Sequence, residues 1–133
     1  MAHKFGTAVL ILAVFFSVLT TLSAGLTPVQ FAQRLGLKVM DAGGVNEVRA
    51  QYAFFFLAIA IVCVAAFFGA LSRESAFVVL ATVFGGLIAG RLVSLGINGG
   101  FAGYGPTIVA LYAIDALGFV LSVTAFALNA SMR

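Results

Sequence analysis

Two opposite charges, Arg91 and Asp115, lie in separate hydrophobic stretches that are each long enough to cross a membrane. A charged side chain at the centre of a bilayer costs roughly 2.5 to 3.5 kcal/mol on insertion scales, so such residues pair, line a polar cavity or carry function. Side chains tilt toward the N-terminus of their own helix, so in adjacent antiparallel helices Arg91 and Asp115 lean toward each other. The sequence therefore predicts a bidentate ion pair between them inside the hydrophobic region.

More polar side chains are expected at the same end of the molecule. Glu47 and Arg49 open another hydrophobic stretch. Tyr52, Ser94 and Tyr112 each lie three positions from one of the basic or acidic residues, a spacing that puts hydrogen-bonding neighbours on one helix face. The predicted polar cluster consists of Glu47, Arg49, Tyr52, Arg91, Ser94, Tyr112 and Asp115. Its two acids and two bases balance, which favours a structural network, and a site for a polar head group, a quinone or a proton is the alternative.

The composition places the chain, residues 1–133, in a membrane as a single transmembrane domain. It is 63% hydrophobic and 8% charged, whereas soluble domains contain about 25% charged residues. Four spans of about 20 residues use most of the length and leave no room for a soluble catalytic domain. The seven Lys and Arg residues are scattered, so the net charge of +3 does not indicate binding to nucleic acid.

The hydropathy pattern predicts an all-α fold, an antiparallel four-helix transmembrane bundle. The expected spans are about 5–26, 48–71, 76–97 and 107–128. Residues 72–75 form a short polar connection, which makes the second and third spans antiparallel neighbours. The first apolar stretch exceeds the roughly 7 to 15 residues of a secretory signal core, so we expect a retained helix. Four spans place both termini on one side of the membrane.

The most polar segment, 27–46, is expected to lie at the membrane surface and to end at the glycine pair Gly43 and Gly44. Its apolar residues recur at every fourth position: Phe31, Leu35 and Val39. This spacing predicts a short interfacial amphipathic helix between the first and second spans. Packing is its expected role, and docking of a partner is the alternative.

Two further segments are rich in glycine. Gly86 and Gly90 have the four-residue spacing that lets helix backbones approach closely, and we expect an internal packing contact there rather than a dimer interface. Residues 98–105 lack the preceding strand and the Lys-Ser/Thr pair of a phosphate-binding loop. They are expected to form a flexible turn that ends at Pro106, a residue suited to the first turn of a helix.

The sequence does not predict an enzyme. His3 is the only histidine, so neither a histidine metal cluster nor a Ser-His-Asp triad can be assembled. Asp41 and Glu74 fall in expected loops, which leaves too few carboxylates for a metal centre of the ferritin type. Ser94 near Asp115 has no base to activate it. We therefore expect no catalytic residue, no metal and no cofactor.

Three parts of the sequence resemble a known family: the run Asn46–Tyr52, the run Gly90–Ser94 and the acid Asp115 in the last span. The chain is similar to an uncharacterised bacterial family of small four-helix integral membrane proteins, catalogued as a domain of unknown function. The resemblance implies the fold and the clustered polar residues, and it implies no reaction. Two positions depart from the family pattern, because Ala53 stands where Gly is expected and Asp115 where Glu is usual.

Small size, short loops, Phe-rich spans and balanced charges favour an accessory or structural subunit that packs against a larger inner-membrane complex, respiratory or photosynthetic. The alternative is a stand-alone binder or carrier of a lipophilic ligand such as a quinone or a lipid. Membrane lipids are expected partners in both cases. The first function adds other integral membrane subunits and the second adds the lipophilic ligand.

The expected location is the bacterial inner (plasma) membrane. Basic residues divide evenly between its two sides, with Lys4, Arg73 and Arg133 on the terminal side and Arg34, Lys38 and Arg49 on the other. The loop after the third span is uncharged, and Arg49 follows Glu47 closely enough for a structural pair between them. The positive-inside rule therefore leans toward cytoplasmic termini.

Overall fold

The computed structural model describes residues 2–131, which form helices joined by turns, without a β-strand among them. The helices are α1 (Ala2–Leu26), α2 (Pro28–Arg34), α3 (Ala42–Val48), η1 (Arg49–Phe54), α4 (Phe55–Phe67), α5 (Arg73–Asn98) and α6 (Pro106–Ala130). The segments α3, η1 and α4 follow one another without a break and form one continuous helix over Ala42–Phe67. Its central part, η1, has π-helical hydrogen bonding.

Four helical stretches within residues 2–131 are long and apolar enough to cross a membrane: His3–Leu26, Ala42–Phe67, Arg73–Asn98 and Pro106–Ala130. They contain 24 to 26 residues each, and about 20 suffice to cross the hydrocarbon core. The all-helical fold with four candidate spans confirms the prediction from hydropathy. The protein is a multi-pass membrane protein.

The second span begins earlier than predicted, at Ala42 instead of Val48, so the glycine pair lies inside a helix. Asp41 has an extended backbone and acts as the N-cap, and its Oδ1 accepts a hydrogen bond from the backbone N–H of Gly44 at 2.9 Å. This side chain satisfies a donor that the helix start otherwise leaves unpaired. The expected linker over 27–46 was therefore too long at its C-terminal end.

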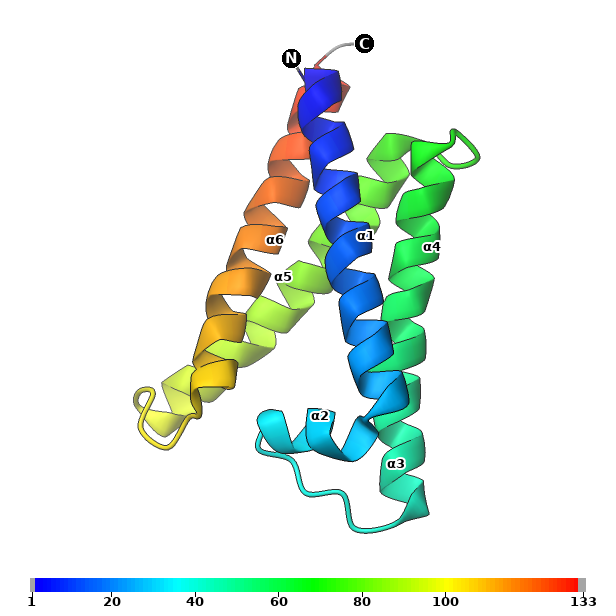
Figure 1. The fold of residues 1–133 in the computed structure, drawn as a ribbon. Coiled ribbons are helices and arrows are strands. Elements are labelled where there is room, and N and C mark those ends of the chain that lie inside the picture. The colour runs from blue at the N-terminus through cyan, green and yellow to red at the C-terminus, as the bar shows by residue number, and fades with distance from the viewer. Residues whose placement is uncertain (1, 132–133) are drawn as a thin grey trace.

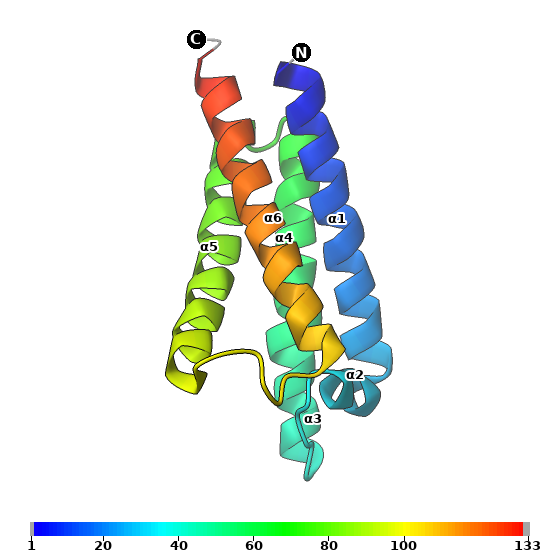
Figure 2. The same cartoon turned by 90° about the vertical axis from the view of Figure 1, so that its left-hand side faces the viewer.

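The spans form two antiparallel pairs, α1 with α4 and α5 with α6 (Figure 1). The two pairs meet at the end of the molecule that carries both termini, and they diverge toward the opposite end (Figure 1). Figure 2 shows α6 in front of α4, with α5 to one side and α2 and α3 at the end away from the termini. We call the two ends of the molecule the narrow end and the wide end.

The core shared by all four spans lies toward the narrow end. Its fully buried large side chains include Leu10 of α1, Cys63 of α4, and Phe77 and Leu80 of α5, each with an exposed fraction of 0%. Ala125 of α6 completes the contact among the four helices. Burial of a Leu or Phe side chain contributes about 1.5 to 3 kcal/mol in water, but in a bilayer close packing is the main attraction between helices.

A second, smaller cluster lies at the wide end and joins α2 to α1, α3 and η1. Its buried members are Ala24, Ala32, Val48 and Ala53, packed against Phe31, Val39 and Tyr52. The interfacial helix α2 is present, but it ends at Arg34 because Gly36 adopts a positive φ of 75° that breaks the helix. Val39, expected to continue the helical face, reaches the cluster from the following loop.

The glycines that allow close approach are not the predicted pair. Gly86 and Gly90 point outward, and a Cβ atom at either position meets no atom within 4 Å. The neighbouring Gly85 lies under the ring of Phe119, and a Cβ at Gly118 lies 2.7 Å from the ring of Phe84. Each helix of the α5–α6 pair thus offers one glycine to an aromatic ring of the other helix. The expected internal contact through Gly86 and Gly90 was wrong, because adjacent helix positions face about 100° apart.

Substituting Gly118 should separate α5 from α6. Gly118→Val forces the ring of Phe84 to move, and overpacking of this kind costs about 1 to 3 kcal/mol. Gly86→Val makes the same chemical change on an open surface and is the matched control. We expect SDS titration of the purified protein to show a lower unfolding midpoint for Gly118→Val only. Equal losses in both variants would contradict this packing, and Phe84→Ala combined with Gly118→Val should restore part of the midpoint.

Candidate functional site

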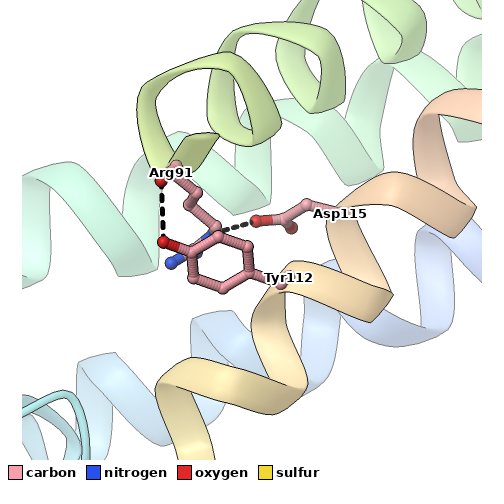
Figure 3. Close-up of polar contacts among 3 residues, drawn as sticks. All are labelled: Arg91, Tyr112 and Asp115. Atoms are coloured by element: carbon pink, nitrogen blue, oxygen red, sulfur yellow. Dashed lines mark hydrogen bonds and ion pairs between the residues drawn. The ribbon is translucent and has the colours of Figure 1, made fainter. Parts of the chain in front are cut away.

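The ion pair between Arg91 and Asp115 is present in the structure, formed between α5 and α6 (Figure 3). Nε of Arg91 donates a hydrogen bond to Oδ2 of Asp115 at 2.5 Å. The side chain of Asp115 is 5% exposed and that of Arg91 is 21% exposed. The two residues lie on antiparallel neighbouring helices and reach toward each other, as their side-chain tilt predicts.

The pair differs from the predicted arrangement in its hydrogen bonds. A bidentate contact was expected, whereas the structure pairs Arg91 with one carboxylate oxygen through Nε. Among residues 2–131, the hydrogen bonds of the Arg91 side chain use Nε, which leaves its two Nη groups available to another acceptor.

Tyr112 adds two contacts to the same arginine. Its hydroxyl donates to the backbone carbonyl oxygen of Arg91 at 2.7 Å, and the guanidinium carbon lies 5.8 Å from the centre of the Tyr112 ring (Figure 3). A cation over an aromatic ring within about 6 Å is attracted to it, with an energy of about 0.5 to 2 kcal/mol. Arg91 is therefore held through its side chain, its backbone and its charge.

The loop between α5 and α6 contributes aromatic contacts that the sequence did not reveal. Phe101 and Tyr104 pack against Tyr112, with ring centres 5.1 Å and 6.2 Å away. The side-chain amide of Asn98 donates to the Tyr104 hydroxyl at 2.6 Å. This glycine-rich segment was expected to be a flexible turn, but its aromatic residues tie it to α6. The sequence did contain one indication of these contacts, namely the aromatic residues Phe101 and Tyr104 between the glycines of this segment.

The remaining residues of the predicted cluster do not join the ion pair. Nε of Arg49 donates instead to the carbonyl oxygen of Gly25 at 3.3 Å, and the Tyr52 ring packs against Phe31 at 5.2 Å between centres. Glu47 is exposed on α3 and Ser94 is exposed on α5. The prediction of a single cluster was wrong because the two helix pairs diverge at this end. Residues at the same depth in the membrane but on different helix pairs are therefore too far apart to join one cluster.

A cleft of about 650 Å³ lies between the two helix pairs and α2. Leu12 and Phe16 of α1 line one wall, and Leu87 of α5 and Leu111 of α6 line the other. Tyr52 of η1 also lines the cleft, opposite Arg91. Three members of the predicted cluster, Tyr52, Arg91 and Asp115, therefore line the same cleft, although Tyr52 is not hydrogen-bonded to the other two.

Charged side chains are few in the wall of the cleft. The charged lining residues are Arg34, Arg91 and Asp115. Arg91 lies about 10 Å along the axis from the Asn98 end of α5, at about 1.5 Å per residue. Arg34 lies at the end of α2, on the wide side of the molecule (Figure 1). The charged groups therefore lie toward the wide end, and the part of the cleft that extends toward the narrow end is lined mainly by apolar side chains.

The described residues do not form a metal site. Within 2–131 there is no group of three or more His, Cys, Asp or Glu side chains that could hold a metal ion. Cys63 is a buried free cysteine in the core of the narrow end. The arrangement offers hydrogen bonds and charge to a bound molecule rather than a coordination sphere.

Replacing one partner of the ion pair should destabilise the protein more than replacing both. Arg91→Leu or Asp115→Leu alone strands a charge in an apolar environment, which typically costs about 3 to 5 kcal/mol. The double variant strands no charge and should recover part of the loss. SDS unfolding midpoints of all three variants give the coupling energy. A double variant as unstable as the sum of the two singles would show that the pair contributes no coupling.

Comparison with known proteins identifies the family. A family model described as domain of unknown function DUF4345 matches residues 6–113. Arg91 and Tyr112 lie inside this range, and Asp115 lies just beyond it. No curated protein and no solved structure matches the chain. The match covers most of the sequence and confirms the resemblance to a domain-of-unknown-function family: the chain belongs to the DUF4345 family.

Proposed function

We propose that this protein binds a lipophilic molecule inside the membrane, in the cleft between the α1–α4 and α5–α6 pairs. The observation that supports this function is the cleft itself, about 650 Å³ in volume, with a mostly apolar wall and the Arg91–Asp115 pair within it. Sites for small molecules are typically about 300 to 1,000 Å³, largely apolar, with a few placed polar groups. The cleft has each of these properties.

An apolar cleft within a bilayer needs an occupant. Walls that face empty space lose the dispersion contacts that hold membrane helices together, and an apolar cavity does not gain from being filled with water. A hydrocarbon chain replaces these contacts at no electrostatic cost. Binding, rather than catalysis, is the role we assign, since Asp115, the acid of the described cleft wall, is already paired with Arg91.

A second function, packing against a larger membrane complex as an accessory subunit, is supported by a different surface. Gly86 and Gly90 are exposed on the outer side of α5, with open space where their Cβ atoms would be. Small residues at this spacing let a second membrane helix approach closely. The same side of the protein also carries the exposed side chains of Val93 and Ile97.

A bacterial inner membrane with cytoplasmic termini is the proposed location. Arg49 is bound to the Gly25 carbonyl oxygen on the far side, and the loop after α5 carries no charge, which supports this orientation. Lys4 and Arg73 are on the terminal side, and Arg133, which was predicted to join them, lies outside the described residues.

Filling the cleft should reduce the amount of bound lipophile. Thr20 lines the cleft and is partly exposed, so Thr20→Phe places a ring in the opening. Thr124 is exposed on α6 away from the cleft lining, and Thr124→Phe is the control. Native mass spectrometry of gently extracted protein should detect bound lipophile in the wild type and in Thr124→Phe, and much less in Thr20→Phe. Wild-type protein that carries no bound molecule would reject this function.

The accessory-subunit function predicts a different result for the outer surface of α5. Gly86→Leu with Gly90→Leu adds bulk where a partner helix would approach, at two positions where an added Cβ meets no atom of this chain within 4 Å. In mild detergent the wild type should migrate in a larger defined assembly, and the double variant should migrate alone with an unchanged unfolding midpoint. Wild-type protein that migrates only by itself or with its own copies would contradict this function.

A further inference from the structure

The charged part of the cleft wall has an excess of positive charge. Arg34 and Arg91 contribute two positive groups and Asp115 one negative group, so the wall carries one net positive charge. Asp115 occupies only Nε of Arg91, and the Nη groups remain available to an acceptor. A guanidinium group in apolar surroundings is best satisfied by an oxyanion, which it binds with charge-assisted hydrogen bonds.

The cleft is long as well as positively charged. Its lining follows α1 from Val9 to Ser23, a distance of about 21 Å at about 1.5 Å per residue. One leaflet of a bilayer provides roughly 15 Å of hydrocarbon, half of the roughly 30 Å core. An acyl chain that fills one leaflet therefore fits along α1, with the apolar lining around it and the charged residues toward the wide end.

The distribution of charge along the cleft separates the occupants that could fill it. An apolar helix from another protein would cover the leucine-rich part of the wall and leave Arg34 and the Nη groups of Arg91 without an acceptor. A second copy of this chain would bring the same positive groups to the contact. A neutral quinone offers carbonyl acceptors but does not balance the net charge. An amphiphile with an acyl chain and a phosphate matches both parts of the wall.

If the cleft binds a lipophilic molecule, as proposed above, its charge specifies which one. We propose that the occupant is an anionic phospholipid of the surrounding bilayer. Its phosphate lies between Arg34 and the Nη groups of Arg91, and one acyl chain extends along α1 toward the core at the narrow end. Arg34 selects the head group, because it is exposed at the end of α2 and lines the cleft without forming part of the Arg91–Asp115 ion pair.

The test uses the full-length protein in detergent with equal amounts of phosphatidylglycerol and phosphatidylcholine that carry the same acyl chains. Native mass spectrometry measures the ratio of the two lipids retained. The wild type should retain phosphatidylglycerol preferentially. Arg34→Gln should lower this preference about fivefold, the effect of one basic residue against an anionic lipid. Lys38→Gln removes the same charge from an exposed neighbour outside the cleft lining and should leave the ratio unchanged.

Two results would overturn the assignment while leaving lipophile binding intact. Equal retention of the two lipids by the wild type would show that the protein does not distinguish between their head groups. Equal losses in Arg34→Gln and Lys38→Gln would show that general surface charge, and not the cleft, attracts the lipid. A wild type that retains neither lipid, nor any other lipophile, would instead reject the function on which the assignment rests.

Discussion

The contact between Arg91 and Asp115 joins α5 to α6 toward the wide end of the molecule, where α1 and α4 are separated from this pair. Toward the narrow end all four helices share a core around Leu10, Phe77 and Leu80. Toward the wide end the α5–α6 pair is held by contacts of its own, namely the ion pair, the Tyr112 hydroxyl bond and the aromatic contacts of the loop. A buried ion pair contributes little net stability by itself because both charges lose their hydration. Its consequence here is geometric: α5 and α6 stay together, so their divergence from α1 and α4 opens a cleft instead of separating four independent helices.

The buried polar atoms are tolerated in the membrane because each has a hydrogen-bond partner within the protein, whereas the Nη groups of Arg91, which lines the cleft, keep their donors free. Asp115 faces the guanidinium, the Arg91 backbone accepts from Tyr112, and the Tyr112 ring lies beside the positive charge. Among residues 2–131, no buried side-chain nitrogen or oxygen is left without a hydrogen-bond partner. The wide end of the α1–α4 pair is stabilised separately. There Thr21 donates to the carbonyl oxygen of Ala53 at 3.0 Å, which anchors the π-helical segment η1 to α1. At the wide end, each helix pair is thus stabilised by hydrogen bonds of its own. This allows the two pairs to diverge there.

Properties that depend on one segment at a time were predictable from the sequence. Hydropathy predicted the four spans, and Pro106 marked the start of α6. A short turn between the second and third spans was also predicted, but it lies at 68–72 and not at 72–75, because Ser72 is the N-cap of α5 and residues 73–75 form its first turn. The approach of Arg91 to Asp115 followed from two neighbouring helices and the tilt of their side chains.

Properties that depend on the rotation of a helix about its axis, or on the lateral distance between helices, were not predictable from the sequence. Gly85 faces α6 and Gly86 faces outward although they are adjacent, and no single-sequence pattern distinguishes them. Glu47 and Arg49 occupy the same end as Arg91, but sequence position along a span reports depth and says nothing of the distance between helix pairs.

The divergence of the helix pairs also relates the two proposed functions to each other. The concave side, between the pairs, contains every charged residue of the cleft wall, whereas the outer side of α5 presents Gly86, Gly90, Val93 and Ile97. An apolar outer surface is already compatible with lipid and requires no partner, because lipid tails solvate it as well as another helix does. A cleft that contains unused guanidinium donors is not satisfied by hydrocarbon alone. The concave side therefore places a stricter requirement on its occupant than the outer side does, and for this reason ligand binding, rather than subunit packing, is the function that the geometry favours.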